Sequence, residues 1–83
     1  MKYYVKTNSI SNLYEINRVV RKLDIDANIY QGRSVIDLNS LLGVFSLDWS
    51  QGVTIEFVSS SPDDQILVST LYGLHGAEVR RLD

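Results

Sequence analysis

Residues 37–47 read Asp-Leu-Asn-Ser-Leu-Leu-Gly-Val-Phe-Ser-Leu, a stretch that is too apolar for an ordinary linker and too short for an ordinary helix. Ser40 stands directly before its main apolar run and has the residue type of an N-cap, whose side-chain oxygen accepts a hydrogen bond from a first-turn backbone N–H. The sequence therefore predicts one short helix that begins after Ser40.

The predicted short helix carries more large apolar side chains than one buried stripe accommodates. Leu41, Val44 and Phe45 recur at helical spacing, and Leu42 lies beside them. We expect at least one of these side chains to be exposed and to belong to a contact patch for another protein. Because a hydroxyl stands at the start of the helix, the pattern also suggests a surface that a phosphate on Ser40 could modify.

The N-terminal part of the chain predicts a strand followed by a helix. Residues 2–7 alternate between apolar and polar side chains with the two-residue period of a half-buried strand. A helix is expected over residues 12–23, where Asn12 and Glu15 have the spacing of a capping box. Its apolar stripe comprises Leu13, Ile16, Val19, Val20 and Leu23.

A hairpin and a further strand flank the short helix. Residues 25–30 alternate in polarity, and residues 31–33, Gln-Gly-Arg, form the tightest turn signal in the chain. Residues 34–37 then provide the second strand of the hairpin. Residues 53–58 show the clearest alternation and predict a central strand.

The C-terminal part predicts a third helix and an ambiguous tail. Ser61 has the type of an N-cap, and Pro62 would take the first helical position. Gly73 or Gly76 would end this helix in the left-handed conformation. Residues 77–83 could either extend a helix against the sheet or fray.

These elements predict a single α+β domain over residues 1–83. Their order is strand, helix, strand, strand, short helix, strand, helix. An antiparallel sheet of four strands with three helices on one face buries every apolar stripe at once.

Composition narrows the classes of function. Of 83 residues, 45% are hydrophobic and 22% charged, which is typical of a folded globular protein. Cysteine is absent and the net charge is −2, so neither disulfides nor a general attraction to nucleic acid or anionic membranes is expected. With no apolar segment of membrane-spanning length, the expectation is a cytoplasmic protein whose partners are proteins or small ligands.

The order of elements and the segment Gly-Arg-Ser-Val-Ile-Asp-Leu-Asn-Ser-Leu-Leu-Gly-Val-Phe-Ser-Leu, residues 32–47, resemble the HPr family of phosphocarrier proteins of the bacterial sugar phosphotransferase system. The resemblance implies the open-faced sandwich of that family. It also implies that Ser40 is a regulatory phosphorylation site, and that Leu41, Leu42 and Phe45 dock partner proteins. An HPr kinase or a transcriptional regulator would be such a partner.

The chain departs from that family at the phosphoryl acceptor. Family phosphocarriers place a histidine at the start of the first helix, followed by an arginine and a proline. The corresponding residues 9–15 contain none of these types, and the positional counterpart is Asn12 or, in another register, Leu13. Neither side chain accepts a phosphoryl group, so histidine phosphotransfer is not expected here. The single histidine, His75, lies far along the chain and is expected to be a surface residue without an assigned role.

Two other features have alternative interpretations. Arg18, Arg21 and Lys22 could bind an acidic partner surface or a phosphoserine, or could simply form a solvated helix face. Trp49 could join the contact patch or cover the edge of the core with its indole N–H on a backbone carbonyl.

The sequence thus predicts a regulatory protein-binding module rather than an enzyme, with no cofactor and no metal site. One alternative is a structural module that self-associates as a homodimer. Another, a phosphocarrier that uses His75, is less favoured.

Overall fold

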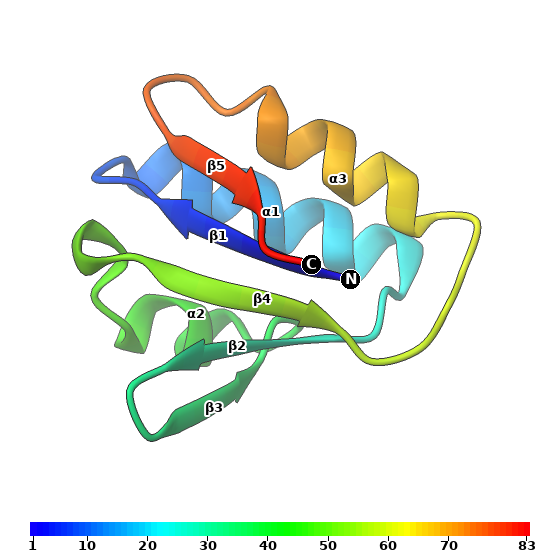
Figure 1. Cartoon of the computed structure of the whole chain (residues 1–83), viewed down its shortest axis with the longest axis horizontal. Helices are drawn as coiled ribbons and strands as arrows, with labels where there is room; N and C mark the ends of the chain where they lie inside the picture. Colours follow the sequence, from blue (N-terminus) through cyan, green and yellow to red (C-terminus); the bar gives the residue numbers. More distant parts are fainter.

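The computed structural model describes residues 1–83 as a five-stranded antiparallel sheet whose one face is covered by three α-helices (Figure 1). The strands are β1 Lys2–Lys6, β2 Ala27–Gln31, β3 Ser34–Asp37, β4 Val53–Phe57 and β5 Glu78–Arg81. The helices are α1 Ile10–Leu23, α2 Leu41–Ser46 and α3 Asp64–Tyr72, with a short 3₁₀ helix, η1, at Trp49–Gln51. The predicted α+β class is confirmed, whereas the predicted count of four strands is wrong.

Strand β4 lies in the middle of the sheet, whose order is β3-β2-β4-β1-β5. Its inward side chains Val53, Ile55 and Phe57 are buried, and the residues between them are half-buried on the opposite face. The prediction of a central strand is therefore confirmed. The hairpin of β2 and β3 also forms as predicted, with Gly32 at φ +57° in its turn.

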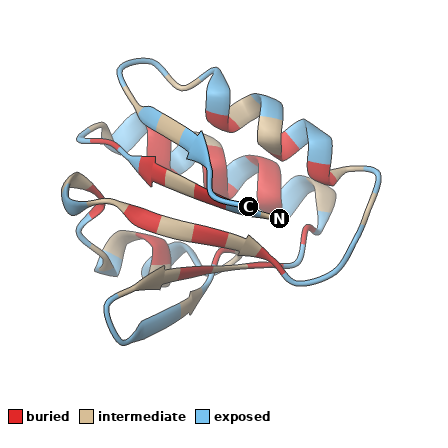
Figure 2. Ribbon diagram, in the orientation of Figure 1, coloured by how far each residue is buried: buried red, intermediate tan, exposed pale blue.

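The core fills the space between the sheet and the helices. A single cluster of 17 buried apolar residues joins the inner face of the strands to the helices (Figure 2). Helix α1 contributes Leu13, Ile16 and Val20, and α3 contributes Leu67 and Leu71. Burying one face of each element removes these side chains from water, which is the main favourable term for a domain of this size.

The tail is a strand, neither a helix nor a frayed end. β5 pairs with β1 in antiparallel register, from Tyr3 opposite Arg81 to Lys6 opposite Glu78. The Asp83 carboxylate extends this contact, because it accepts a hydrogen bond from the Lys2 N–H at 3.1 Å. Without β5, β1 would be an edge strand with unpaired backbone groups, and β5 supplies their hydrogen-bond partners. The sequence of the tail alone does not predict this pairing.

Helix α1 begins earlier than predicted. Its N-cap is Ser9, which accepts from the N–H of Asn12, so the helix starts at Ile10 and the predicted capping box of Asn12 and Glu15 is wrong. Asn12 is instead buried inside the first turn. Its amide donates to Thr7 Oγ1 and to the carbonyl oxygen of His75, both at 3.0 Å. These bonds satisfy the buried amide and tie the start of α1 to the turn after α3.

The start of α3 follows the predicted chemistry with a shifted boundary. Ser61 accepts from the N–H of Asp63, and the Asp64 carboxylate accepts from the N–H of Ser61, which is a reciprocal capping arrangement. The regular helix begins only at Asp64, so Pro62 lies in the turn before it. Gly73 ends the helix at φ −87°, not in the left-handed conformation that was expected, and Gly76 adopts φ +73° in the turn that follows.

None of the α-helices combines the length and apolar character that a membrane span requires.

Candidate functional site

Ser40 is the N-cap of α2, as the sequence predicts. Its backbone is extended, and its hydroxyl oxygen accepts from the N–H of Gly43 at 3.1 Å. The residues before it are fixed to α1, because the buried amide of Asn17 donates to the carbonyl oxygens of Leu38 and Asn39 at 3.2 and 3.3 Å. Ser40 itself is exposed. The hydroxyl is therefore held at a defined place on the surface.

Helix α2 divides its apolar side chains between core and solvent. Val44 is fully buried, whereas Leu42 is 87% exposed and Leu41 is 37% exposed. Phe45 is half-buried at the edge of the core. The prediction that at least one of these side chains would be exposed is confirmed, since a helix of six residues offers only one narrow side to the sheet.

Tyr14 is a member of the same surface that the sequence analysis missed. It is 55% exposed on α1, and its ring centroid lies 4.9 Å from that of Phe45. Tyr14 lies within the predicted helix but outside its apolar stripe, so the sequence gives no local signal for its contact with Phe45.

The predicted basic residues line an open groove of about 590 Å³ between α1 and α2. Its walls are formed by Tyr14, Asn17, Arg18, Arg21, Lys22 and Leu41. The structure thus brings the three predicted cations together with one of the predicted docking leucines. We call Tyr14, Leu41, Leu42 and Phe45, together with these three cations, the α1–α2 surface.

The three cations of the α1–α2 surface are not equivalent. Arg18 donates two hydrogen bonds to the Glu15 carboxylate, at 2.7 and 3.1 Å. These bonds, together with the positive charge of the guanidinium, hold the pKa of Glu15 below its usual value. Arg21 and Lys22 have no acidic side chain within 4.0 Å, as the ion pairs of the chain involve other residues. They are the cations free to meet an external acidic group.

Trp49 lies outside this surface. Its side chain is 3% exposed, and its indole N–H donates to the carbonyl oxygen of Val44 at 2.7 Å. Of the two interpretations of Trp49, the one that places it at the edge of the core is confirmed. Its hydrogen bond holds η1 against the end of α2, so it supports the α1–α2 surface from within.

Asn12 and His75 lie at the other end of α1. Asn12 is buried, and its amide NH₂ donates to Thr7 Oγ1 and to the carbonyl oxygen of His75. His75 is exposed in the turn after α3, and its backbone carbonyl, not its imidazole, makes the contact with Asn12. No group of three or more histidine, aspartate or glutamate side chains is placed to hold a metal ion.

Comparisons with known proteins found no match to this chain among protein-family models, curated proteins or solved structures.

Proposed function

We propose that the chain is an HPr-like regulatory module that binds protein partners through the α1–α2 surface, without histidine phosphotransfer and without catalysis of its own. Its proposed setting is the bacterial cytoplasm, where an HPr kinase or a transcriptional regulator would be the partner. Phosphorylation of Ser40 is the proposed control. The resemblance of residues 32–47 to the HPr family and the geometry of this surface support the proposal.

One observation carries the proposal more than any other. Helix α2 turns Leu42 almost completely into solvent, 87% exposed, beside Leu41, which lines the same groove as the exposed Tyr14. Apolar side chains gathered beside uncommitted cations are typical of protein contact surfaces, in which a few anchors supply most of the binding energy.

Phosphorylation of Ser40 would alter this surface without unfolding it. A phosphoserine carries a charge of about −1.5 to −2, which the positive end of a helix tolerates. The segment that carries Ser40 is fixed to α1 through Asn17, one helical turn before Arg21. The new charge would therefore lie close to the free cations, and a partner would meet a different electrostatic surface.

We do not expect histidine phosphotransfer, because the acceptor position is occupied by Asn12. Asn12 offers a neutral amide whose N–H groups are already donated to Thr7 and to the backbone of residue 75. A phosphoryl acceptor needs a nucleophilic atom, which an amide nitrogen is not.

The test is incubation with an HPr kinase and ATP, followed by mass spectrometry of the phosphopeptides. The proposal expects phosphate on Ser40 and none on the neighbouring exposed Ser46. Ser40→Ala would abolish the modification. If Ser40 stays unmodified while the same kinase phosphorylates its own HPr, the regulatory part of the proposal is refuted.

A matched pair of variants tests docking in the same assay. Leu42→Asp removes the exposed anchor and is expected to slow phosphorylation about tenfold or more at low protein concentration. Val58→Asp makes the same change at another exposed apolar residue, 55% exposed and distant from α2, and should leave the rate unchanged. Equal rates for both variants would exclude Leu42 from the kinase contact.

A further inference from the structure

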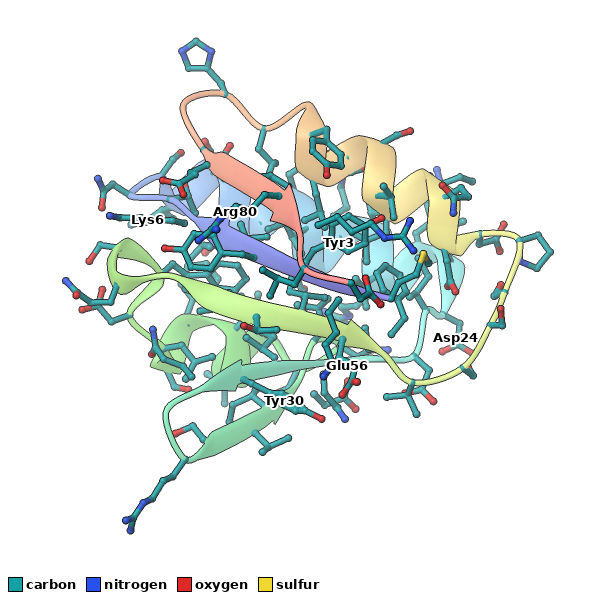
Figure 3. All side chains as sticks on the ribbon, viewed as in Figure 1. Tyr3, Lys6, Asp24, Tyr30, Glu56 and Arg80 are labelled. Carbon is teal, nitrogen blue, oxygen red and sulfur yellow. The ribbon has the colours of Figure 1, made fainter.

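The face of the sheet opposite the helices carries a continuous row of uncharged side chains. The strand register aligns Val35 with Tyr30, Tyr30 with Thr54, and Thr54 with Tyr4. Arg80 closes the row on β5, opposite Tyr4. No helix covers this face, and Figure 3 shows Tyr30, Glu56, Lys6 and Arg80 on it. The row therefore crosses every strand of the sheet on its open side.

The side chains of this row are fixed in place and partly accessible. The guanidinium of Arg80 lies over the Tyr4 ring, 4.5 Å from its centroid. The same ring packs so closely on Gly52 that a Cβ added there would overlap it. Val35, at the other end of the row, is 60% exposed on an edge strand. An apolar side chain left outward on an edge strand is a feature that natural sheets usually avoid unless it is covered.

The charges around the row leave one cation and one anion unpaired. The charged residues that point to this face are Lys2, Lys6, Asp37, Glu56, Glu78 and Arg80. Lys2 pairs with Glu56, and Arg80 pairs with Glu78, each at 3.7 Å. Lys6 and Asp37 have no ion-pair partner within the chain.

These two unpaired charges lie at opposite corners of the face. Lys6 lies two residues after Tyr4 on β1, and in the strand register it stands opposite Glu78 of β5. Asp37 lies on edge strand β3, and the register connects it through Asn28 and Glu56 to Lys2, at the other end of β1. Asp37 and Lys6 are thus separated both across the strands and along them, with the tyrosine row between them.

We propose that this face binds a second copy of the chain, face to face and related by a two-fold axis. When such an axis lies in the interface along the diagonal that does not pass through Lys6 and Asp37, it brings these two opposite corners together. Lys6 of each copy then meets Asp37 of the other, twice per dimer, and the two rows cross near their middle, where Tyr30 and Thr54 of the two copies meet.

Charge complementarity selects a second copy over an anionic ligand. The face has no net charge, and two of its three cations are already neutralised by their own acids. A nucleic acid or an acidic peptide would find only Lys6 free, whereas a second copy satisfies both Lys6 and Asp37.

The size of the face limits the surface area that the dimer can bury. Five strands spaced about 4.8 Å apart and four to five residues long bury roughly 700 Å² over both copies, below the range of stable interfaces. The association is therefore weak and concentration-dependent. Because the helices lie on the other side of the sheet, the dimer leaves both α1–α2 surfaces free, and its existence does not depend on the function proposed above.

The test is sedimentation equilibrium on the full chain at protein concentrations from about 10 μM to 1 mM, the range in which a small interface saturates. The wild-type protein should shift from monomer to dimer. Lys6→Glu and Asp37→Lys each place like charges together twice per dimer and should raise the dissociation constant about tenfold or more. The combined variant Lys6→Glu with Asp37→Lys restores the opposite charges and should return it to within about threefold of wild type.

Asp63→Lys is the matched control, since it makes the same change of charge in the turn before α3, on the helix side of the sheet, at a side chain that makes no cap hydrogen bond, and it should leave the dissociation constant unchanged. Circular dichroism checks that every variant folds. A monomer at all concentrations overturns the proposal. So does a dimer that neither single reversal weakens, or a combined variant that is weaker than both single variants.

Discussion

The ring of Tyr14 on α1 lies against the ring of Phe45 on α2, with centroids 4.9 Å apart and ring planes inclined at 54°. Tyr14 is mostly exposed and Phe45 is half-buried, so the pair lies where the core ends and the surface begins. The contact helps to fix the position of α2, a helix of six residues that would not be stable in isolation. The α1–α2 surface is therefore defined by packing between its two helices.

A double-mutant cycle measures this contact. Tyr14→Ala and Phe45→Ala should each lower the free energy of unfolding, the second by more because Phe45 is more buried. Their coupling should be about 0.5–1.5 kcal/mol, the value expected for an aromatic pair. Urea denaturation followed by Trp49 fluorescence provides the measurement. A coupling indistinguishable from zero would show that the two rings do not position each other.

Ser40 variants separate capping from phosphorylation. Ser40→Ala removes the acceptor for the Gly43 N–H and should cost about 0.5–2 kcal/mol of stability. Ser40→Asp keeps an acceptor at the cap and adds a favourable charge at the helix start, so its stability should stay near that of wild type. Thermal unfolding of the three proteins tests this order. If Ser40→Ala is as stable as Ser40→Asp, the hydroxyl contributes nothing as a cap.

Gly43 is required by the approach of α2 to β3. A Cβ at this position would overlap Cγ2 of Ile36, so Gly43→Ala should destabilise the protein by about 1–3 kcal/mol although alanine favours helices. Gly73→Ala is the control, because its nearest neighbour would lie at 3.4 Å and its φ is −87°. Chemical denaturation of both variants gives the comparison. Equal stabilities would mean that α2 can move away from β3 at little cost.

Trp49 supports α2 through its indole N–H. Trp49→Phe removes the donor to the Val44 carbonyl and leaves space in a buried site, so we expect a loss of about 1–3 kcal/mol. Far-ultraviolet circular dichroism in urea measures both proteins, since the variant lacks the only tryptophan. The wild-type fluorescence should shift to longer wavelength on unfolding. An unshifted spectrum would contradict the burial of this side chain.

The pair of Glu15 and Arg18 predicts a pH dependence at acid pH. The pKa of Glu15 is lower in the folded protein than in the unfolded chain, chiefly because Arg18 donates hydrogen bonds to its carboxylate. The ionised form is thus favoured by folding, so the pair's contribution is complete at neutral pH and is lost as the pH falls through the lowered pKa. NMR titration of Glu15 should show its pKa rising towards the ordinary value in Arg18→Gln. An unchanged pKa in that variant would assign the shift to another cause.

Much of the fold could be predicted because its signals are local. The alternation of Val53, Ile55 and Phe57 requires a half-buried strand, and the serine before an apolar run requires the cap at Ser40. The hairpin turn at Gly32 is equally local, since glycine adopts its positive φ without strain. Each of these features depends only on neighbouring residues.

The features that could not be predicted depend on distant parts of the chain. Strand β5 exists because β1, more than seventy residues earlier, offers unpaired backbone groups to a short charged segment with little apolar pattern of its own. The start of α1 was misplaced because Asn12 has the type of a cap, yet the fold buries it against Thr7 and the turn at His75. The contact of Tyr14 with Phe45 is likewise formed only when α1 and α2 pack together. The α2 part of the surface is therefore predictable from the sequence, because its signal is local, whereas the part played by Tyr14 depends on how α1 packs against α2.

The central claim is that the α1–α2 surface, and not the open face of the sheet, binds a regulatory protein partner other than a second copy of the chain. Titration of the ¹⁵N-labelled protein with an HPr kinase, followed by amide chemical shifts, tests it most directly. The account predicts shifts centred on Tyr14, Arg21 and Leu42, with little change at Tyr30 and Glu56. Binding that shifts the sheet residues and leaves α1 and α2 unchanged would contradict it, as would the absence of any shift at saturating kinase.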